Sequence, residues 1–233
     1  MVLRILQSFR ELLNRVVDFA RWPLVVVMVM GLWFVGPIVW RAIAQLAKRD
    51  GWALPFVIGA IVYAVLWYST GRRSKTLAWL MTLEHELTHA LMAILTLNGI
   101  HSLKSHSTLG GLVEISGRSN WMVLVAPYVL PTVLLPLSVL LAWAPPSWRS
   151  FVLCLIGLAF AFHVHSSFLE THRRQTDLQE LGWTFVALFV PTAHLWALLW
   201  FSGVLLGHQR HLTAAWVETI HFPFRAITKL LGN

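Results

Sequence analysis

The densest cluster of ionisable side chains in the sequence reads Glu84-His85-Glu86-Leu87-Thr88-His89. On a helix, His85 and His89 share one face, so both imidazoles can reach a single metal ion. Glu86 is offset by one residue, which places its carboxylate beside such an ion. In this His-Glu-x-x-His spacing, zinc lowers the pKa of a water towards about 7 and the glutamate accepts the proton. The motif predicts zinc-assisted hydrolysis with His85 and His89 as ligands and Glu86 as the base.

A catalytic zinc site needs a third protein ligand besides the two histidines. Asp177 is the best candidate, because the other aspartates, Asp18 and Asp50, lie in an amphipathic segment and a basic linker. A helix cap or an ion pair with a neighbouring arginine is the alternative role for Asp177. Four further side chains near the end of the preceding apolar segment remain possible ligands: His163, His165, Glu170 and His172.

The composition predicts that these residues lie in a membrane protein. Hydrophobic residues make up 57 % and charged residues 12 % of the 233 positions, against roughly 25 % charge in soluble domains. This excludes an ordinary soluble enzyme or a disordered chain, and the single cysteine excludes an internal disulfide. We expect an all-α membrane protein with about six transmembrane helices of about 20 residues each. The predicted spans are 22–40, 51–70, 76–97, 121–143, 148–168 and 181–206.

The two ends of the chain have a different pattern from the predicted transmembrane domain, residues 22–206. Apolar residues recur at helical spacing in 1–21 among several charges, which predicts an amphipathic helix in the membrane interface. Residues 207–233 are expected to do the same. The net charge of +8 comes from basic residues between apolar segments. We therefore expect anionic lipid headgroups of the bilayer, and not nucleic acid, as their partner.

A short segment after the zinc motif lacks a helical pattern. Residues 109–116 contain Gly110 and Gly111, which allow close approach of backbones, followed by Leu112 and Val113. We predict a membrane-associated β segment whose unpaired edge binds an extended substrate through these four residues. A plain interfacial hairpin is the alternative. Further on, the fourth span contains Pro127, Pro131 and Pro136. Two alternatives stay open for them: a kink in the span, or the ordinary tolerance of proline in membrane helices.

Over about residues 80–130 the sequence resembles the site-2 protease family of intramembrane zinc metalloproteases. The matching features are the zinc motif through Leu91, Gly99-Ile100, the segment from Gly110 to Ile115, and Ala126-Pro127. The family's third ligand is an aspartate in a Leu-Asp-Gly context, and its nearest equivalent here is Asp177. The resemblance implies a multi-pass membrane protein (of the cell membrane in a prokaryote), Zn²⁺ as cofactor and single-span membrane proteins as substrates.

Two further expectations concern orientation and rival functions. Six spans and a modest excess of Lys and Arg on the side of the termini place the zinc site opposite the cytoplasm. The resemblance places it towards the cytoplasm, and we follow the resemblance because the excess is small. The rivals are an inactive scaffold or chaperone that retains the protease fold and, less favoured, a metal transporter that uses His85, His89 and the histidines of 163–172.

Overall fold

The computed structural model describes residues 2–48, 53–70, 74–106, 110–116, 119–206 and 221. The described chain is mostly helical with a short β segment, as the sequence predicts at this level, and the β segment forms one antiparallel hairpin. Its elements are α1 (Val2–Lys48), α2 (Ala53–Ser69), α3 (Lys75–Leu95), β1 (Ile100–His106), β2 (Gly110–Ile115), α4 (Trp121–Val129), α5 (Leu134–Trp143), α6 (Pro146–Glu170), α7 (Thr176–Leu181) and α8 (Trp183–Leu206). The predicted C-terminal amphipathic tail lies outside the described residues, apart from His221.

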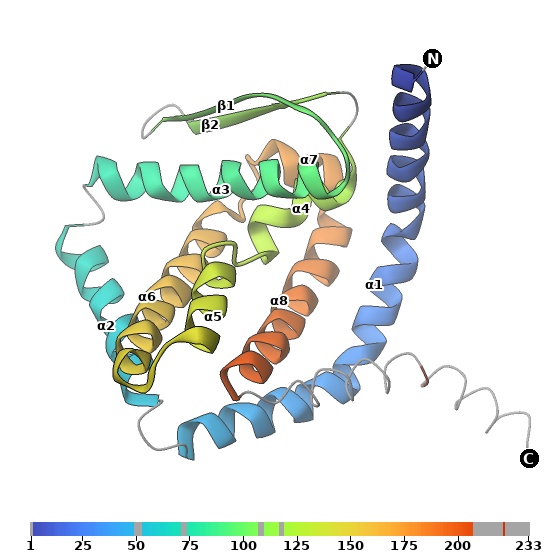
Figure 1. Cartoon of the computed structure of the whole chain (residues 1–233). Helices are drawn as coiled ribbons and strands as arrows, with labels where there is room; N and C mark the ends of the chain where they lie inside the picture. Colours follow the sequence, from blue (N-terminus) through green and yellow to red (C-terminus); the bar gives the residue numbers. More distant parts are fainter. Residues whose placement is uncertain are drawn as a thin grey trace, which may run out of the picture.

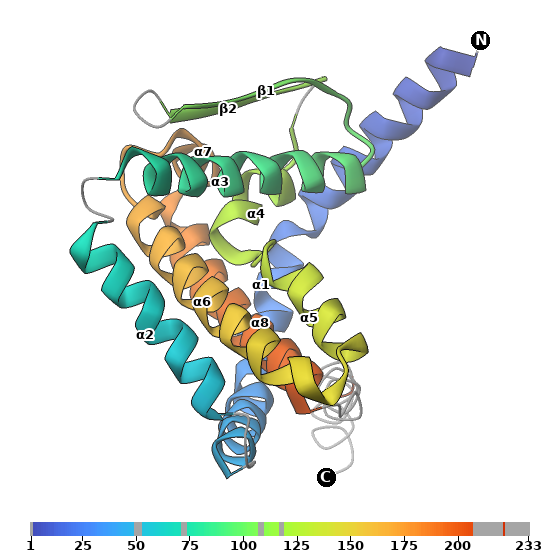
Figure 2. The same ribbon diagram turned by 60° about the vertical axis from the view of Figure 1, so that its left-hand side comes forward.

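The helices form a bundle that is closed at one end by α3 and the hairpin. α2 and α5 pack against α6, and α1 packs against α8. α3 lies across the ends of α2, α6 and α8, and β1 and β2 cover its outer side (Figures 1 and 2). The N-terminus of α1 lies at this same end of the bundle (Figure 1).

The predicted count of six transmembrane helices is not confirmed. Within the described residues, only Ile5–Phe34 and Pro146–Glu170 are long and apolar enough to cross a bilayer, and the bent pair α4–α5 would make a third span. Ala53–Ser69 and Trp183–Leu199 are apolar but shorter. α1 runs without interruption from Val2 to Lys48, through the predicted boundary at residue 22.

The predicted third span forms a helix, but it does not run alongside the others. Glu84, His85 and Glu86 are 6–7 % exposed. The protein itself covers these polar side chains, because α3 lies between α4 on one side and the hairpin on the other. The charges of Lys75 and the two glutamates also distinguish α3 from the apolar helices.

Of the two alternatives for the prolines of the fourth span, the structure shows the kink. The helix stops at Val129 and resumes at Leu134, with a bend of 62° between the two parts. Pro131 lies in the break, where its missing N–H and fixed φ prevent a continuous helix. α4 can therefore pack against α3 while α5 turns to pack against α6.

The predicted β segment is β2, which pairs with β1. Lys104 lies opposite Leu112 and His106 opposite Gly110, with a bulge near Ile100 and Ser102. The strand β1 was not expected, because His101, Lys104 and His106 interrupt any clear alternation of apolar residues in 100–106.

Two glycines allow α2 and α6 to approach closely. A Cβ on Gly59 would lie 1.9 Å from the Cys154 carbonyl oxygen, and one on Gly157 would lie 1.9 Å from that of Phe56. These are backbone atoms, which cannot move away as a side chain can. The two helices are therefore held together by the small-residue packing that is typical of membrane helices.

Replacing Gly59 with alanine is expected to lower the free energy of unfolding by about 1–3 kcal/mol, since the added methyl must push α6 away. The measurement is denaturant unfolding of the full chain in detergent micelles. Gly36→Ala in α1 is the control, because nothing lies within 4 Å of a Cβ there. Equal stability of Gly59→Ala and the parent protein would contradict the close packing of α2 on α6.

Candidate metal centre

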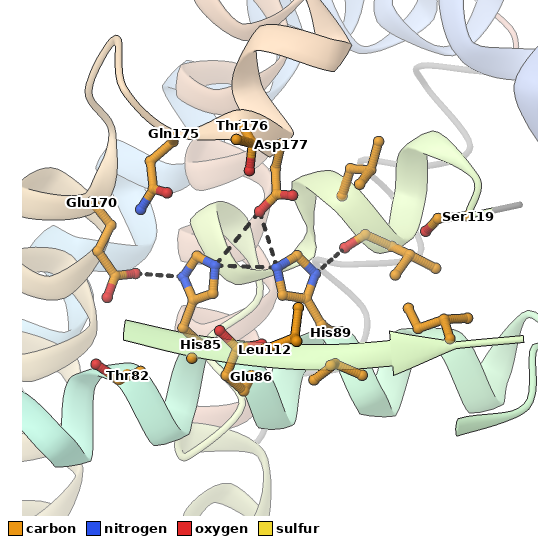
Figure 3. A pocket seen from close by; sticks show the side chains of 15 residues that line it. Thr82, His85, Glu86, His89, Leu112, Ser119, Glu170, Gln175, Thr176 and Asp177 are labelled. Atoms are coloured by element: carbon orange, nitrogen blue, oxygen red, sulfur yellow. Dashed lines mark hydrogen bonds and ion pairs between the residues drawn. The ribbon is translucent and has the colours of Figure 1, made fainter. Parts of the chain in front are cut away.

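Three side chains from two helices meet at the closed end of the bundle. His85 and His89 project from the same face of α3, and Asp177 from the first turn of α7 (Figure 3). The Nε2 atoms of the two histidines are 3.1 Å apart, and Asp177 Oδ2 lies 3.2 Å from His89 Nε2 and 3.8 Å from His85 Nε2. Within the described residues, this is the one group of three His, Cys, Asp or Glu side chains able to share a metal ion.

The other nitrogen of each imidazole is occupied by an acceptor. His85 Nδ1 lies 2.6 Å from Glu170 Oε2, and His89 Nδ1 lies 2.8 Å from the Val123 carbonyl oxygen. Because both partners accept hydrogen bonds, each Nδ1 must carry a proton. Only the two Nε2 atoms are then available as ligands, and they point towards each other and towards Asp177. This donor set fits a metal ion, since hydrogen bonds on the outer nitrogens are typical of metal-binding histidines.

The charge state of Asp177 also suits a ligand. Burial alone would raise the pKa of its carboxyl group, but the hydrogen bonds and charges of His85 and His89, when both rings are protonated in place of a bound metal ion, lower the pKa well below its usual range. Asp177 is therefore ionised at neutral pH, as a metal ligand must be. Gly182, at a φ of 81°, ends α7 and turns the chain into α8.

Glu86 belongs to the same cavity. The cavity has a volume of about 480 Å³, and Glu86 is 7 % exposed. β2 passes so close that a Cβ on Gly111 would lie 2.3 Å from Glu86 Oε1. The cavity is lined by Thr82, His85, Glu86, His89, Gly111, Leu112, Val113, Ile115, Ser119, Val123, Leu124, Glu170, Gln175, Thr176 and Asp177 (Figure 3). Three of the four residues proposed to bind substrate are among them: Gly111, Leu112 and Val113.

A family model described as Peptidase M50B-like matches residues 56–206, which is well over half of the chain. The chain belongs to this family. The match agrees with the resemblance to site-2 proteases, and it contains all three residues of the cluster together with Glu86. No curated protein and no solved structure matches the chain. α1 lies outside the matched M50B-like domain.

The alternative third ligands of the M50B-like domain all have other partners. His163 Nδ1 is 3.3 Å from Glu84 Oε1 in the buried interior, and His165 Nδ1 is 2.7 Å from the Tyr63 hydroxyl. His172 is exposed and accepts a hydrogen bond from the backbone N–H of Arg174. The carboxylate of Glu170 reaches His85 at the nitrogen opposite the cluster.

Two residues near the cluster carry no clear signal in the sequence. Val123 acts through its backbone carbonyl, which any residue would supply. Tyr128 packs its ring edge-on against His85, with ring centroids 5.3 Å apart. Tyr128 follows the Ala126-Pro127 pair of the family resemblance, but which way its ring points depends on the packing of α4 on α3.

Replacing Glu170 with glutamine is expected to weaken metal binding by about 10–100-fold, because a neutral amide holds and polarises His85 less strongly than a carboxylate. The measurement is a zinc competition titration with the purified full chain. Glu180→Gln is the control, since Glu180 is exposed one turn after Asp177. If Glu170→Gln binds zinc as the parent protein does, the negative charge of Glu170 has no role in metal binding.

Proposed function

We propose that this M50B-like protein is an intramembrane zinc metalloprotease that hydrolyses peptide bonds of single-span membrane proteins. One observation carries the proposal. Two imidazole nitrogens and a carboxylate oxygen converge within 4.8 Å of one another, and Glu86 lines the same cavity. Two nitrogens and one oxygen suit zinc, and three protein ligands leave one coordination position open for catalysis.

Each side chain of the site has a defined role in this proposal. His85, His89 and Asp177 hold the ion, which when bound acidifies water and polarises the carbonyl of the scissile bond. Glu86 accepts a proton from the attacking water and returns it to the departing amine. Glu170 and the Val123 carbonyl keep the two imidazoles in the orientation that presents Nε2.

The strand β2 is the proposed binding element for substrate. Within the described residues it pairs with β1 only, so its other edge keeps free backbone N–H and C=O groups. Gly111, Leu112 and Val113 line the cavity beside Glu86. A peptide in a helix hides its amide bonds, whereas one added to this edge would be extended and open to attack. A transmembrane substrate would therefore unwind locally before it is cut.

Replacing Gly111 with alanine is expected to reduce hydrolysis by at least about tenfold while metal affinity stays unchanged, since a displaced general base forfeits part of a contribution of about 10²–10⁴-fold. The new methyl would meet Glu86 and push its carboxylate away, but it would leave the three ligands in place. Hydrolysis and zinc affinity are measured on the same preparation. Loss of zinc together with activity would contradict the expectation that the added methyl displaces Glu86 and leaves the metal ligands in place.

We also propose how the chain lies in the bilayer. If α1, α2, the α4–α5 pair, α6 and α8 cross it, the N-terminus and the metal centre lie on the same side (Figure 1). Among the described residues, the elements at this end carry Arg4, Arg10, Arg15, Lys75, Lys104, Arg173 and Arg174, and those at the other end carry Arg41, Lys48 and Arg149. The excess favours a site that faces the cytoplasm. Because α3 does not cross in this arrangement, the charge pattern and the family resemblance no longer conflict.

The proposal is tested with the full chain reconstituted in liposomes. We expect about one zinc per chain by elemental analysis, and cleavage of a fluorescent single-span reporter that chelator abolishes and zinc restores. A chain that binds no zinc would overturn the proposal. Zinc binding without cleavage of a panel of such reporters would favour the inactive scaffold, and metal uptake into the liposomes would favour the transporter.

A further inference from the structure

One face of α1 carries three polar residues at helical spacing: Asn14, Asp18 and Arg21. Positions i, i+4 and i+7 point the same way on a helix, and the same face continues into the buried Val25 and Met28. The sequence indicated an interfacial helix here. The structure turns this polar face towards the protein, while apolar side chains of the same segment such as Phe9, Leu12 and Phe19 are exposed.

Two residues of this polar face, Asn14 and Asp18, form hydrogen bonds with the start of α4. Asn14 is 8 % exposed, and its Oδ1 accepts hydrogen bonds from Asn98 Nδ2 at 3.2 Å and from Asn120 Nδ2 at 2.8 Å. The Asn120 side chain in turn caps α4, because it accepts from the backbone N–H groups of Met122 and Val123. Asp18 accepts from the backbone N–H of Trp121 at 3.2 Å. The residue held by this cap, Val123, supplies the carbonyl that holds His89.

The third residue of the polar face, Arg21, contacts the C-terminal end of α7. The Arg21 guanidinium donates to the carbonyl of Leu181, the last residue of that helix. It also lies 4.0 Å from the ring centroid of Phe185, which is fully buried. A cation at the C-terminal carbonyls of a helix and over an aromatic face is stabilising. α7 has six residues, too few to be stable without tertiary contacts, and it carries Asp177.

We propose that Asn14, Asp18 and Arg21 of α1 are positioning residues for the metal centre. Asn14 and Asp18 act on His89 through the cap of α4, and Arg21 acts on Asp177 through α7. None of the three touches a ligand. The inference rests on the proposed function. It gives α1, which lies outside the M50B-like match, a role in positioning the metal ligands.

The test is a Co²⁺ titration of the metal-free full chain in detergent micelles, followed by the visible absorption of the bound ion. We expect Asn14→Leu and Arg21→Met each to weaken Co²⁺ binding by about tenfold, at the low end for groups that orient ligands. Gln7→Leu and Arg15→Met are the matched controls, since both residues are exposed on α1 and Gln7 lies two turns before Asn14 on the same face. The controls should bind Co²⁺ as the parent protein does.

A double-mutant comparison separates positioning from a general loss of stability. In an Asp177→Ala background, Arg21→Met should cause no further loss of Co²⁺ affinity, because the ligand through which it acts is gone. Asn14→Leu should still cause its loss. An equal effect of Arg21→Met with and without Asp177 would overturn the proposal, as would parent-like affinity in both single variants.

If Arg21→Met does not fold, Arg21→Lys takes its place. Lysine keeps the positive charge and can donate to the Leu181 carbonyl, but it loses the planar contact with Phe185. We therefore expect Co²⁺ affinity to fall by about threefold to tenfold. Parent-like Co²⁺ affinity and spectrum in that variant would overturn the role of Arg21. A parent protein that binds no Co²⁺ would overturn the proposed function together with this inference, and the titration of the parent shows this before any variant is compared.

Discussion

Replacing Glu86 with glutamine should reduce peptide-bond hydrolysis by about 10²–10⁴-fold, which is the usual contribution of a general base, while zinc stays bound. Glutamine has the shape of glutamate but cannot accept a proton from water at neutral pH. The three ligand atoms belong to other residues, so metal affinity should not change. The two measurements are reporter cleavage and zinc content on the same preparation.

Glu84→Gln is the matched control for Glu86→Gln. Glu84 lies two residues earlier on α3 and is equally buried, but its carboxylate faces His163. A glutamine oxygen can still accept from His163, so this variant should retain hydrolysis within a few-fold. Cleavage by Glu86→Gln at the rate of the parent protein would eliminate Glu86 as the base.

Replacing Asp177 with alanine should weaken zinc binding by more than about 100-fold, since removal of a ligand costs more than removal of a group that only orients one. The two histidines would remain, but two ligands do not make a stable catalytic zinc site. Zinc competition titration measures the effect, and hydrolysis should disappear with the metal. Glu180→Ala on the same short helix is the control, because Glu180 is exposed.

Asp177→Ala also decides between the two carboxylates near the histidines. Glu170 contacts His85 through Nδ1, on the far side of the ring from His89. If Asp177→Ala bound zinc with undiminished affinity while Glu170→Gln lost it, Glu170 would be the third ligand. His85 would then bind the ion through Nδ1, and the cluster of Nε2 atoms would not be the metal site.

The His-Glu-x-x-His motif could be found from the sequence because its spacing is local. His85 and His89 are one helical turn apart, so any helix at this position places their rings together. The apolar composition and the prolines of 127–136 are equally local, and they indicated a helical protein in which the kink that the structure shows was one of two alternatives. Asp177 emerged by elimination among few aspartates, but Glu170 and three histidines remained as alternatives because linear distance does not show which side chain reaches the cluster.

What only the tertiary structure decided is how these local elements face one another. The apolar segment 76–97 predicted a helix, but it did not predict that this helix lies across the bundle. Helical periodicity predicted that residues 1–21 are amphipathic, but it did not predict that Asn14, Asp18 and Arg21 face inward to α4 and α7. The physical reason is that backbone hydrogen bonds and side-chain spacing act within a few residues of the chain. Partners such as His85 and Glu170, or Asn14 and Asn120, are joined only by packing between distant segments.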